Sequence, residues 1–328
     1  MGTKIEWTQE TINLAVGCTK CSPGCENCYA AKLAATRLQH HPDYKGLAES
    51  DYMGSEPIAE GYDWTGEVRM LEYNLEKITK MQKPRMIFLN SMGDLFHESV
   101  SIGFLVDVFR TILSAGRLHG HTFQILTKRP DRMAELVPII MNQICGYEWQ
   151  MPNYIWLGVT AENQEQADKR IPLLIQTPAA VRFVSVEPML GGINLTRIQE
   201  GKAYLDVLNG RWRRNGKDGG SLIGKLDWVI CGGETGQNAR PMHPDWVRSL
   251  RDQCQDAGVP FFFKSWGEWH EIADDEKENP FSRNTAYLNV DGGCKFSKTL
   301  KCLHKIGKKR AGRVLDGHTW DEYPEVGR

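Results

Sequence analysis

Three features are missing from this sequence, and each absence excludes a class of protein. No uninterrupted apolar run approaches the roughly 18–20 residues of a membrane-spanning helix, and the first residues, Met-Gly-Thr-Lys-Ile-Glu, lack the apolar core of a secretory signal. An excess of charge is also missing, with 40 Lys and Arg against 41 Asp and Glu in 328 residues. Such a balance argues against a protein that coats nucleic acid by bulk electrostatics. We therefore expect a cytoplasmic protein that makes no contact with a membrane.

The composition is ordinary except for its cysteines. With 41% hydrophobic and 25% charged residues, the chain resembles an average globular protein and not a disordered, collagenous or coiled-coil one. Four of the nine cysteines fall within one short segment, at Cys18, Cys21, Cys25 and Cys28. The other five are isolated, and we expect them to pack as small hydrophobic side chains: Cys145, Cys231, Cys254, Cys294 and Cys302.

The cysteine loop, defined here as residues 17–29, has three interpretations. In a reducing cytoplasm a tight cluster indicates metal or redox chemistry and not a disulfide framework. A zinc site usually needs a second ligand pair, which the sequence lacks, although the four cysteines could close one zinc knuckle alone. A redox pair, Cys25 with Cys28 or Cys18 with Cys21, leaves two thiols unexplained. An iron–sulfur cluster held by three or four thiolates explains them best.

The spacing within the loop resembles one known signature. Cys21-x3-Cys25-x2-Cys28, followed by the aromatic Tyr29, is similar to the motif of radical S-adenosylmethionine (SAM) enzymes. That resemblance implies a [4Fe–4S] cluster with one iron left open for SAM, because an open coordination position makes a metal site reactive. Residues 30–35 are expected to form a helix, so Cys28 would stand near its start, where the helix dipole favours a thiolate.

The rest of the chain predicts an α/β scaffold. Short, nearly continuous apolar runs are typical of parallel strands buried on both faces. Helical stretches are expected between them at 101–116, 130–144, 164–176 and 244–257. Alternating strands and helices predict a full or partial parallel (β/α) barrel, TIM-like and radical-SAM-like. The seven expected strands are 11–16, 85–90, 122–127, 155–160, 181–186, 227–231 and 259–264.

Polar side chains follow six of these strands, at the barrel end where chemistry belongs. Together they predict a polar ligand pocket on the same face as the cysteine loop, although any one of them could simply be a solvated strand end. For SAM we assign the first set: Asn90, Ser91, Asp94, Thr160, Glu162, Asn163, Glu187 and Glu234. For a carboxylate or phosphate of the substrate we assign Lys128, Arg129 and Lys264. No catalytic residue is assigned.

Two inserts and a tail stand outside the alternating pattern of the barrel, which we place at residues 1–270. Residues 38–66 are rich in Gly, Asp and Tyr, and residues 199–225 hold a basic stretch with a central tryptophan. The C-terminal extension, 271–328, carries eight Lys and Arg and no acid between Lys295 and Arg313, and we expect it to pack on the barrel. Clustered basic residues favour a polyanion such as nucleic acid, although a solvated surface is the plain alternative. The candidates are Arg213, Arg214, Lys308, Lys309 and Arg310.

Many segments resemble a phage and prophage family of uncharacterised, radical-SAM-like proteins with a three-cysteine motif. The resemblance covers nearly the whole chain outside the two inserts. It is carried by 17–20 and 22–30 at the cysteines, 88–97 (Phe-Leu-Asn-Ser-Met-Gly-Asp-Leu-Phe-His), 126–130 (Leu-Thr-Lys-Arg-Pro), 158–164 (Gly-Val-Thr-Ala-Glu-Asn-Gln), 185–190 (Ser-Val-Glu-Pro-Met-Leu), 232–236 (Gly-Gly-Glu-Thr-Gly), 239–242 (Ala-Arg-Pro-Met), 262–269 (Phe-Phe-Lys-Ser-Trp-Gly-Glu-Trp), 312–313 and 315–320.

This resemblance bears on the ligand set. The family pattern implies Cys18, Cys25 and Cys28 as the three cysteines, with an apolar residue where Cys21 stands here. We assign the metal ligands to those three, and keep Cys21 as an alternative third or fourth ligand.

The expected function is a radical-SAM-like iron–sulfur enzyme that generates a 5′-deoxyadenosyl radical. Its substrate would preferably be a nucleic acid or nucleotide, to be modified or repaired inside the phage's host cell, and its cluster would need an electron donor. The alternative is a nucleic-acid-binding phage protein with a structural iron–sulfur or zinc site and no radical chemistry. A zinc-stabilised barrel with a non-redox activity is a third possibility. The oligomeric state, the substrate and the redox partner stay open.

Overall fold

The computed structural model describes residues 3, 5–50, 61–222, 224–271, 284–293 and 299–325. The chain divides into two compact units, of which the first comprises Met1–Val159 with Leu173–Phe183 and the second Thr160–Pro172 with Val184–Glu325. None of the described helices has the length and apolar character needed to cross a membrane.

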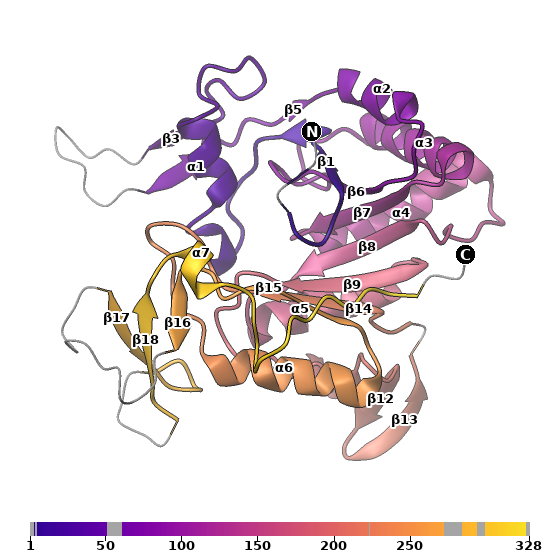
Figure 1. Ribbon diagram of the computed structural model, residues 1–328. Coiled ribbons are helices and arrows are strands. Elements are labelled where there is room, and N and C mark those ends of the chain that lie inside the picture. Colours follow the sequence, from indigo (N-terminus) through magenta and orange to yellow (C-terminus); the bar gives the residue numbers. More distant parts are fainter. Residues whose placement is uncertain are drawn as a thin grey trace. The chain divides into compact units, whose positions relative to one another are not determined.

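The principal sheet has seven strands that follow one another in chain order (Figure 1). Its first four strands pair in parallel, as do its last two. Neighbouring strands that are also consecutive in the alternating pattern are characteristic of (β/α) barrels. The predicted α/β class and a partial barrel are thereby confirmed. The strands are β1 (Glu10–Ile12), β6 (Met86–Leu89), β7 (Thr122–Thr127), β8 (Ile155–Thr160), β9 (Val181–Val186), β14 (Trp228–Gly232) and β15 (Phe261–Ser265).

A side-chain hydrogen bond and a glycine determine where the helix α3 begins and ends. Ser101 Oγ accepts a hydrogen bond from Phe104 N at 3.2 Å at the start of α3, and Gly120, at φ 68°, ends that helix in the left-handed conformation that glycine favours. Helices α3 and α4 lie side by side, with α3 against β7 (Figure 1). The α-helices are α1 (Tyr29–Ala35), α2 (Tyr73–Lys80), α3 (Ile102–His119), α4 (Pro130–Cys145), α5 (Gln164–Gln176), α6 (Pro244–Ala257) and α7 (Lys308–Ala311).

The sheet is built from strands buried on both faces. All six residues of β8 are buried, as the apolar runs predict. At Gly158 an added Cβ would lie 2.5 Å from the Phe183 ring. Glycine is therefore required at that point in β8 because the aromatic ring packs directly on the backbone.

The predicted strand at 11–16 is wrong in one respect, because it is two strands. Asn13 interrupts the run between β1 and β2 (Ala15–Val16), and β2 pairs antiparallel with β5 (Arg69–Met70). The Asn13 side chain accepts hydrogen bonds from the Ser91 and Met92 amides at 2.8 and 3.1 Å. These bonds turn the chain out of the sheet just before the cysteine loop.

The segments outside the alternating pattern form small antiparallel sheets. In the first insert, β3 (Ala48–Ser50) pairs with β4 (Tyr62–Trp64). The second insert holds a four-stranded sheet, and the C-terminal region a three-stranded one ordered β16-β18-β17. Their strands are β10 (Ile198–Glu200), β11 (Ala203–Asp206), β12 (Arg211–Arg214), β13 (Lys217–Ser221), β16 (Trp269–Glu271), β17 (Thr285–Leu288) and β18 (Lys301–Lys305).

Candidate functional site

The cysteine loop begins where two chain segments approach at glycines. Gly17 follows β2, its N–H donates to Met92 O at 3.1 Å, and it forms a parallel bridge with Gly93, which follows β6. A Cβ at Gly93 would lie 2.8 Å from Ala15 O, and Gly17 has φ 90°. Gly93 is needed because a side chain there would push the cysteine loop away from the carboxyl end of β6. Gly17 is needed because of its positive φ and because an added Cβ would lie 2.1 Å from Glu67 O.

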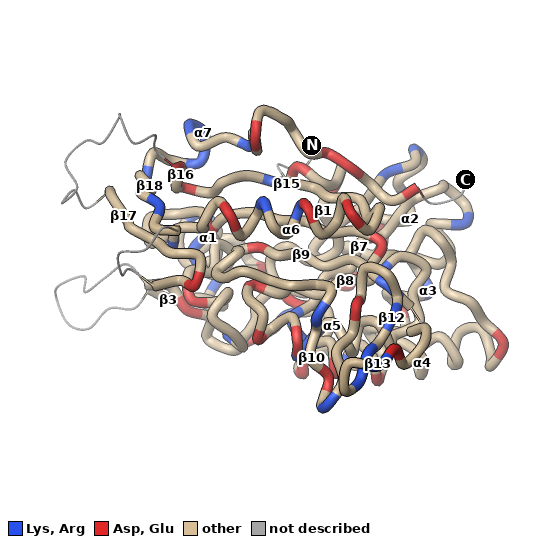
Figure 2. Tube along the Cα trace, turned by 90° about the horizontal axis from the view of Figure 1, so that it is seen from below, with Lys and Arg blue, Asp and Glu red and all other residues tan. Residues whose placement is uncertain are grey.

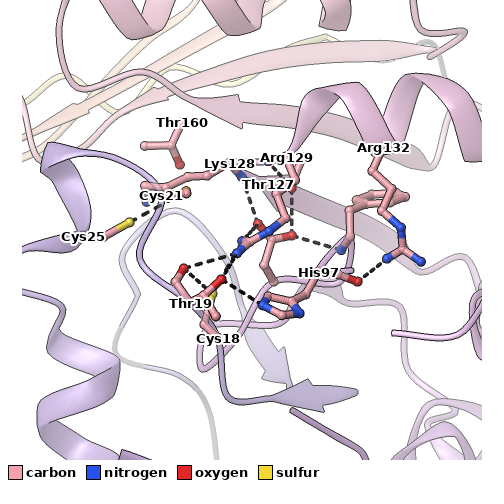
Figure 3. Close-up of polar contacts among 12 residues, drawn as sticks. Cys18, Thr19, Cys21, Cys25, His97, Thr127, Lys128, Arg129, Arg132 and Thr160 are labelled. Atoms are coloured by element: carbon pink, nitrogen blue, oxygen red, sulfur yellow. Dashed lines mark hydrogen bonds and ion pairs between the residues drawn. The ribbon is translucent and has the colours of Figure 1, made fainter. Parts of the chain in front are cut away.

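Arg129 is the second residue after β7, and its side chain also holds the cysteine loop in place. Its guanidinium donates to Thr19 Oγ1 at 2.7 Å, to Thr19 O at 3.2 Å and to Cys18 Sγ at 3.6 Å. Figure 3 shows the Arg129 side chain directed at Thr19 and Cys18. It is only 6% exposed. Arg129, which we assigned to the substrate, therefore makes these hydrogen bonds within the protein. They form a tie between the end of β7 and the cysteine loop.

Asp94 is the buried counterion of Arg129, at 3.2 Å. The same carboxylate accepts hydrogen bonds from Thr127 Oγ1 at 2.7 Å and from the amides of Phe96 and Lys128, both at 3.0 Å. A buried charge is tolerated when it is paired and hydrogen-bonded in this way. Asp94, which we assigned to SAM, therefore organises the ends of β6 and β7.

His97 and Arg132 extend the network. The hydroxyl of Thr19 lies 3.0 Å from His97 Nε2, and Arg132 donates to His97 O and, at 2.6 Å, to Val100 O. Burial, together with the charge of Arg129, lowers the pKa of His97. The imidazole is accordingly neutral at pH 7, which suits a side chain beside a guanidinium.

The loop thiols differ sharply in acidity. Burial and the charge of Asp94 raise the pKa of Cys18 to about 11, against the opposing effect of Arg129. A hydrogen bond from Cys21, at a sulfur–sulfur distance of 4.0 Å, lowers the pKa of Cys25 to about 4, against the opposing effect of burial, and the charge of Lys128 adds to the lowering. Cys28 stands at the N-cap of α1.

The side chains of the cysteine loop that could bind a metal have the chemistry of iron–sulfur cluster ligands. They are thiols alone, one of them within reach of a guanidinium that would offset the negative charge of a thiolate-bound cluster. In the described residues no three His, Cys, Asp or Glu side chains gather closely enough to hold a single metal ion. Binding by Cys18, Cys25 and Cys28 would therefore require their side chains to turn toward a common point.

Asn90 and Ser91, both assigned to SAM, form hydrogen bonds with residues just before the cysteine loop and at its end. Asn90 lies in the left-handed region at φ 68° and its Oδ1 accepts from the Leu14 and Ala15 amides at 2.7 and 3.2 Å. Ser91 O accepts from the Tyr29 hydroxyl at 2.6 Å. These bonds hold the two ends of the cysteine loop against the segment that follows β6.

Sequence reasoning missed the residues that shape this site from within. Asn13, Thr19, His97 and Arg132 all contribute hydrogen bonds to it. Only Asn13 carried a signal, as the single amide side chain in the run at 11–16. The others become visible only when segments between 32 and 110 residues apart are brought together.

In the second unit, the acidic residues assigned to SAM have basic partners. Glu162 is fully buried and pairs with Arg170 at 2.9 Å, and Arg170 also donates to Thr160 O at 2.9 Å. Asn163 Oδ1 accepts from Gln166 N at 3.0 Å, in the first turn of α5. These residues thus stabilise the end of β8 and the start of α5.

Two further pairs follow β9 and β14. Glu187 lies 2.5 Å from Lys264, with both side chains partly exposed. Glu234 receives both the side chain and the backbone N–H of Arg240, with the closest contact at 2.6 Å. Each predicted ligand of SAM in this unit therefore has a partner within the protein, and the assignment to SAM stays a prediction.

The predicted basic residues of the second unit lie in two places. Arg213 and Arg214 are exposed on β12. Lys308, Lys309 and Arg310 form the first three residues of α7, and the last two of them are exposed. Cys294, Lys295 and Lys298 fall outside the described residues.

The fold and the cysteine loop define a class: an α/β protein of partial-barrel topology whose thiol-rich loop stands at the carboxyl ends of parallel strands. Within that class the chain belongs to the family described as proteins of unknown function (DUF5131), which it matches over residues 2–324. No curated protein and no solved structure matches the chain.

Proposed function

We propose that this protein is a radical-SAM-like iron–sulfur enzyme that modifies or repairs a nucleic acid or nucleotide. The observation that carries the proposal is the tie between Arg129 and the cysteine loop, at 2.7 Å to Thr19 and 3.6 Å to Cys18. This tie holds the cysteine loop, whose candidate ligands are all thiols, at the carboxyl ends of β6 and β7. Barrel enzymes carry their chemistry at this edge of the sheet. The radical-SAM spacing and the resemblance to the phage family support the same assignment.

When bound, a reduced [4Fe–4S] cluster would supply the electron that cleaves SAM and releases a 5′-deoxyadenosyl radical. Cys18, Cys25 and Cys28 would hold the cluster, with Cys21 as the alternative third or fourth ligand. An electron donor would be a necessary partner.

The protein's own residues have separate tasks in this proposal. Arg129 offsets the charge of thiolates and orients Cys18, and Asp94 in turn orients Arg129. The ammonium of Lys128 contributes to the low pKa of Cys25, and its amide is fixed by Asp94. Cys25 is thereby ionised at neutral pH, as metal binding requires, whereas Cys18, whose pKa is raised to about 11, would lose its proton on binding the cluster.

Single cysteine substitutions test the ligand set. After anaerobic incubation with iron and sulfide, we expect Cys18→Ala, Cys25→Ala and Cys28→Ala to lose most bound iron and the brown visible absorption. Cys21→Ala should retain both. Cys145→Ala, which removes an exposed cysteine of α4, is the matched control and should load as the wild type does. If Cys21→Ala loses the iron while Cys18→Ala keeps it, the ligand assignment is wrong.

The proposed chemistry is tested separately on wild-type protein loaded with the cluster. Anaerobic incubation with dithionite and SAM should release 5′-deoxyadenosine, measured by chromatography, and Cys28→Ala should release none. Cluster-loaded protein that leaves SAM intact would overturn the radical proposal and favour a structural cluster in a nucleic-acid-binding protein. A colourless protein that binds zinc and takes up no iron would overturn both.

A further inference from the structure

The four-stranded sheet β10–β13 of the second unit has one apolar and one polar face. Residues directly opposite each other in neighbouring strands share a face. Ile198 pairs with Leu205, and Leu205 with Trp212, so these three line one face, where Ile198 and Leu205 are buried. Gln199 pairs with Tyr204, and Tyr204 with Arg213. These residues line the opposite face, which is open because Tyr204 is 38% exposed and Arg213 is exposed.

An aromatic and guanidinium pair stands on the open face. The guanidinium of Arg197 lies 4.4 Å from the centre of the Tyr204 ring, and both side chains are exposed. A guanidinium stacked on a phenol ring offers flat surfaces on which an unpaired base can stack. Tyr204 is thus a large aromatic side chain that is 38% exposed on this face.

Positive charge surrounds that pair. Residues 197–225 contain seven Lys and Arg against three Asp and Glu, in a chain of net charge −1. Figure 2 shows Lys and Arg along β12 and β13. Within the described part of the chain, Arg213 and Arg214 form no ion pair, whereas Arg211 lies 3.7 Å from Asp218. The Arg213 guanidinium is therefore available for a phosphate on the open face, whereas Arg214 pairs with Ala203 and lies on the face of Trp212.

The turn of the β12–β13 hairpin carries further positive charge and has a defined backbone conformation. Asn215 and Gly216, at φ 52° and 74°, form the tight turn that Asn-Gly favours in hairpins. The turn sets Lys217 opposite Arg214. Trp212 braces the hairpin from the apolar face, where a Cβ at Gly219 would lie 2.4 Å from the indole. The basic side chains thus stand on a braced hairpin, in which the register of the two strands shifts once, between Trp212 and Arg213.

We propose that the open face of β10–β13 is a docking surface for single-stranded nucleic acid. Bases would stack on the Arg197–Tyr204 pair, and a phosphate would pair with Arg213, which lies directly opposite Tyr204. The inference rests on the proposed function only for the class of substrate. A duplex fits the face less well, because its bases are already stacked on one another and offer no free surface to Tyr204.

Fluorescence anisotropy with a labelled oligothymidine of about 15 nucleotides, a length typical of single-strand sites, tests the surface directly. Full-length protein should bind this probe more tightly than a duplex of equal length and more tightly than anionic lipid vesicles. Because single-strand binding loses about 0.7 in the salt slope for each phosphate contact removed, Arg213→Gln should lower the slope of log K against log salt by about 0.7. Tyr204→Leu should weaken binding roughly tenfold with the slope unchanged.

The control Lys83→Gln removes the same charge from an exposed position of the first unit and should bind as the wild type does. Circular dichroism establishes that each variant is folded. The protein carrying Cys25→Ala and Cys28→Ala should bind the probe unchanged, so failure of the cluster and failure of this surface are distinguishable. The proposal is overturned if the wild type does not bind the probe, if duplex or vesicles bind as tightly, or if Arg213→Gln and Lys83→Gln behave alike.

Discussion

Single side chains in this protein decide whether the cysteine loop stays at the strand ends, and Arg129 is the foremost of them. The sequence places Lys128 and Arg129 directly after a strand, which favours an interpretation as ligand-binding groups. The structure instead directs the Arg129 guanidinium toward Thr19, which precedes it by 110 residues in the chain. A single sequence cannot distinguish these roles, because a polar residue at a strand end has the same pattern whether its partner is a ligand or another segment.

Arg129→Gln should therefore destabilise the whole first unit. It leaves the Asp94 carboxylate buried without its counterion, a change that costs about 3–5 kcal/mol in the free energy of unfolding. Arg110→Gln, which breaks an exposed pair with Asp107, should cost less than about 0.5 kcal/mol. Urea unfolding measures both.

The double variant Asp94→Asn with Arg129→Gln provides the decisive comparison. Removing both charges should recover part of the lost free energy of unfolding, because no buried charge is then left alone. If Arg129→Gln alone is no more harmful than Arg110→Gln, Arg129 is not the tie that we describe.

His121 gives the stability of the protein a dependence on pH. Its ring is fully buried, Nδ1 accepts from Arg85 N at 3.1 Å, and Nε2 lies 3.0 Å from Met81 O. Burial lowers the pKa of His121 below its ordinary value of 6.5, and the charge of His119 adds to this effect, against the hydrogen bond to Met81. Because the unfolded chain then takes up the proton more readily, stability should fall as the pH drops below about 6.5.

Comparison of wild type with His121→Asn isolates this contribution. Between pH 7.5 and 5.5 the wild type should lose more free energy of unfolding than the variant, by at most about 1.4 kcal/mol for each pH unit below 6.5. His97, whose pKa is also lowered, remains in both proteins and cancels in the difference. Parallel pH profiles for the two proteins would contradict the assignment.

At the scale of elements, the sequence predicts the principal sheet well. The expected strands at 122–127, 155–160 and 181–186 coincide with β7, β8 and β9, and the expected helices at 164–176 and 244–257 coincide with α5 and α6. These elements are buried on both faces or strongly amphipathic, so their periodicity alone identifies them.

The elements that sequence reasoning missed obtain their stability from pairing and not from a periodic pattern. β2 has two residues and exists because it pairs with β5, more than fifty residues away. The four-stranded sheet of the second insert was expected only as a basic loop. Its β13 reads Lys-Asp-Gly-Gly-Ser and is exposed throughout, so it has no apolar alternation to reveal a strand.

The close approach of Gly17 and Gly93 leads to a prediction at the scale of elements. Gly93→Ala would place a methyl group 2.8 Å from Ala15 O and 2.9 Å from Gly17 O, and should displace the cysteine loop from the end of β6. We expect a lower melting temperature and less iron retained after reconstitution. Gly103→Ala, in α3 with nothing within 4 Å of the added Cβ, is the matched control. It should be neutral or stabilising by about 0.5–1 kcal/mol, and equal behaviour of the two variants would exclude the close approach as a constraint.

At the scale of the whole molecule, the two units are interleaved in the chain. The first unit ends at Val159 and is completed only by Leu173–Phe183. Within that later segment Leu174, Ile175 and Phe183 are buried, and the Phe183 ring packs on Gly158 and lies 6.3 Å from the Trp7 ring. A length-based division of the sequence into consecutive domains misses this arrangement, because the return of the chain to the first unit is a tertiary event.

Two N-terminal fragments test whether this return completes the first core. The fragment 1–159 lacks the buried segment and should show no cooperative unfolding transition, because Trp7 and the backbone at Gly158 lose the aromatic ring that covers them. The fragment 1–183 restores that ring together with Leu174 and Ile175, and should unfold cooperatively in urea when followed by tryptophan fluorescence. Phe183→Ala within the longer fragment should cost about 3–5 kcal/mol, the usual loss for a buried phenylalanine. If 1–159 unfolds as cooperatively as 1–183, the first unit is already complete at Val159 and the later segment is an addition to its surface.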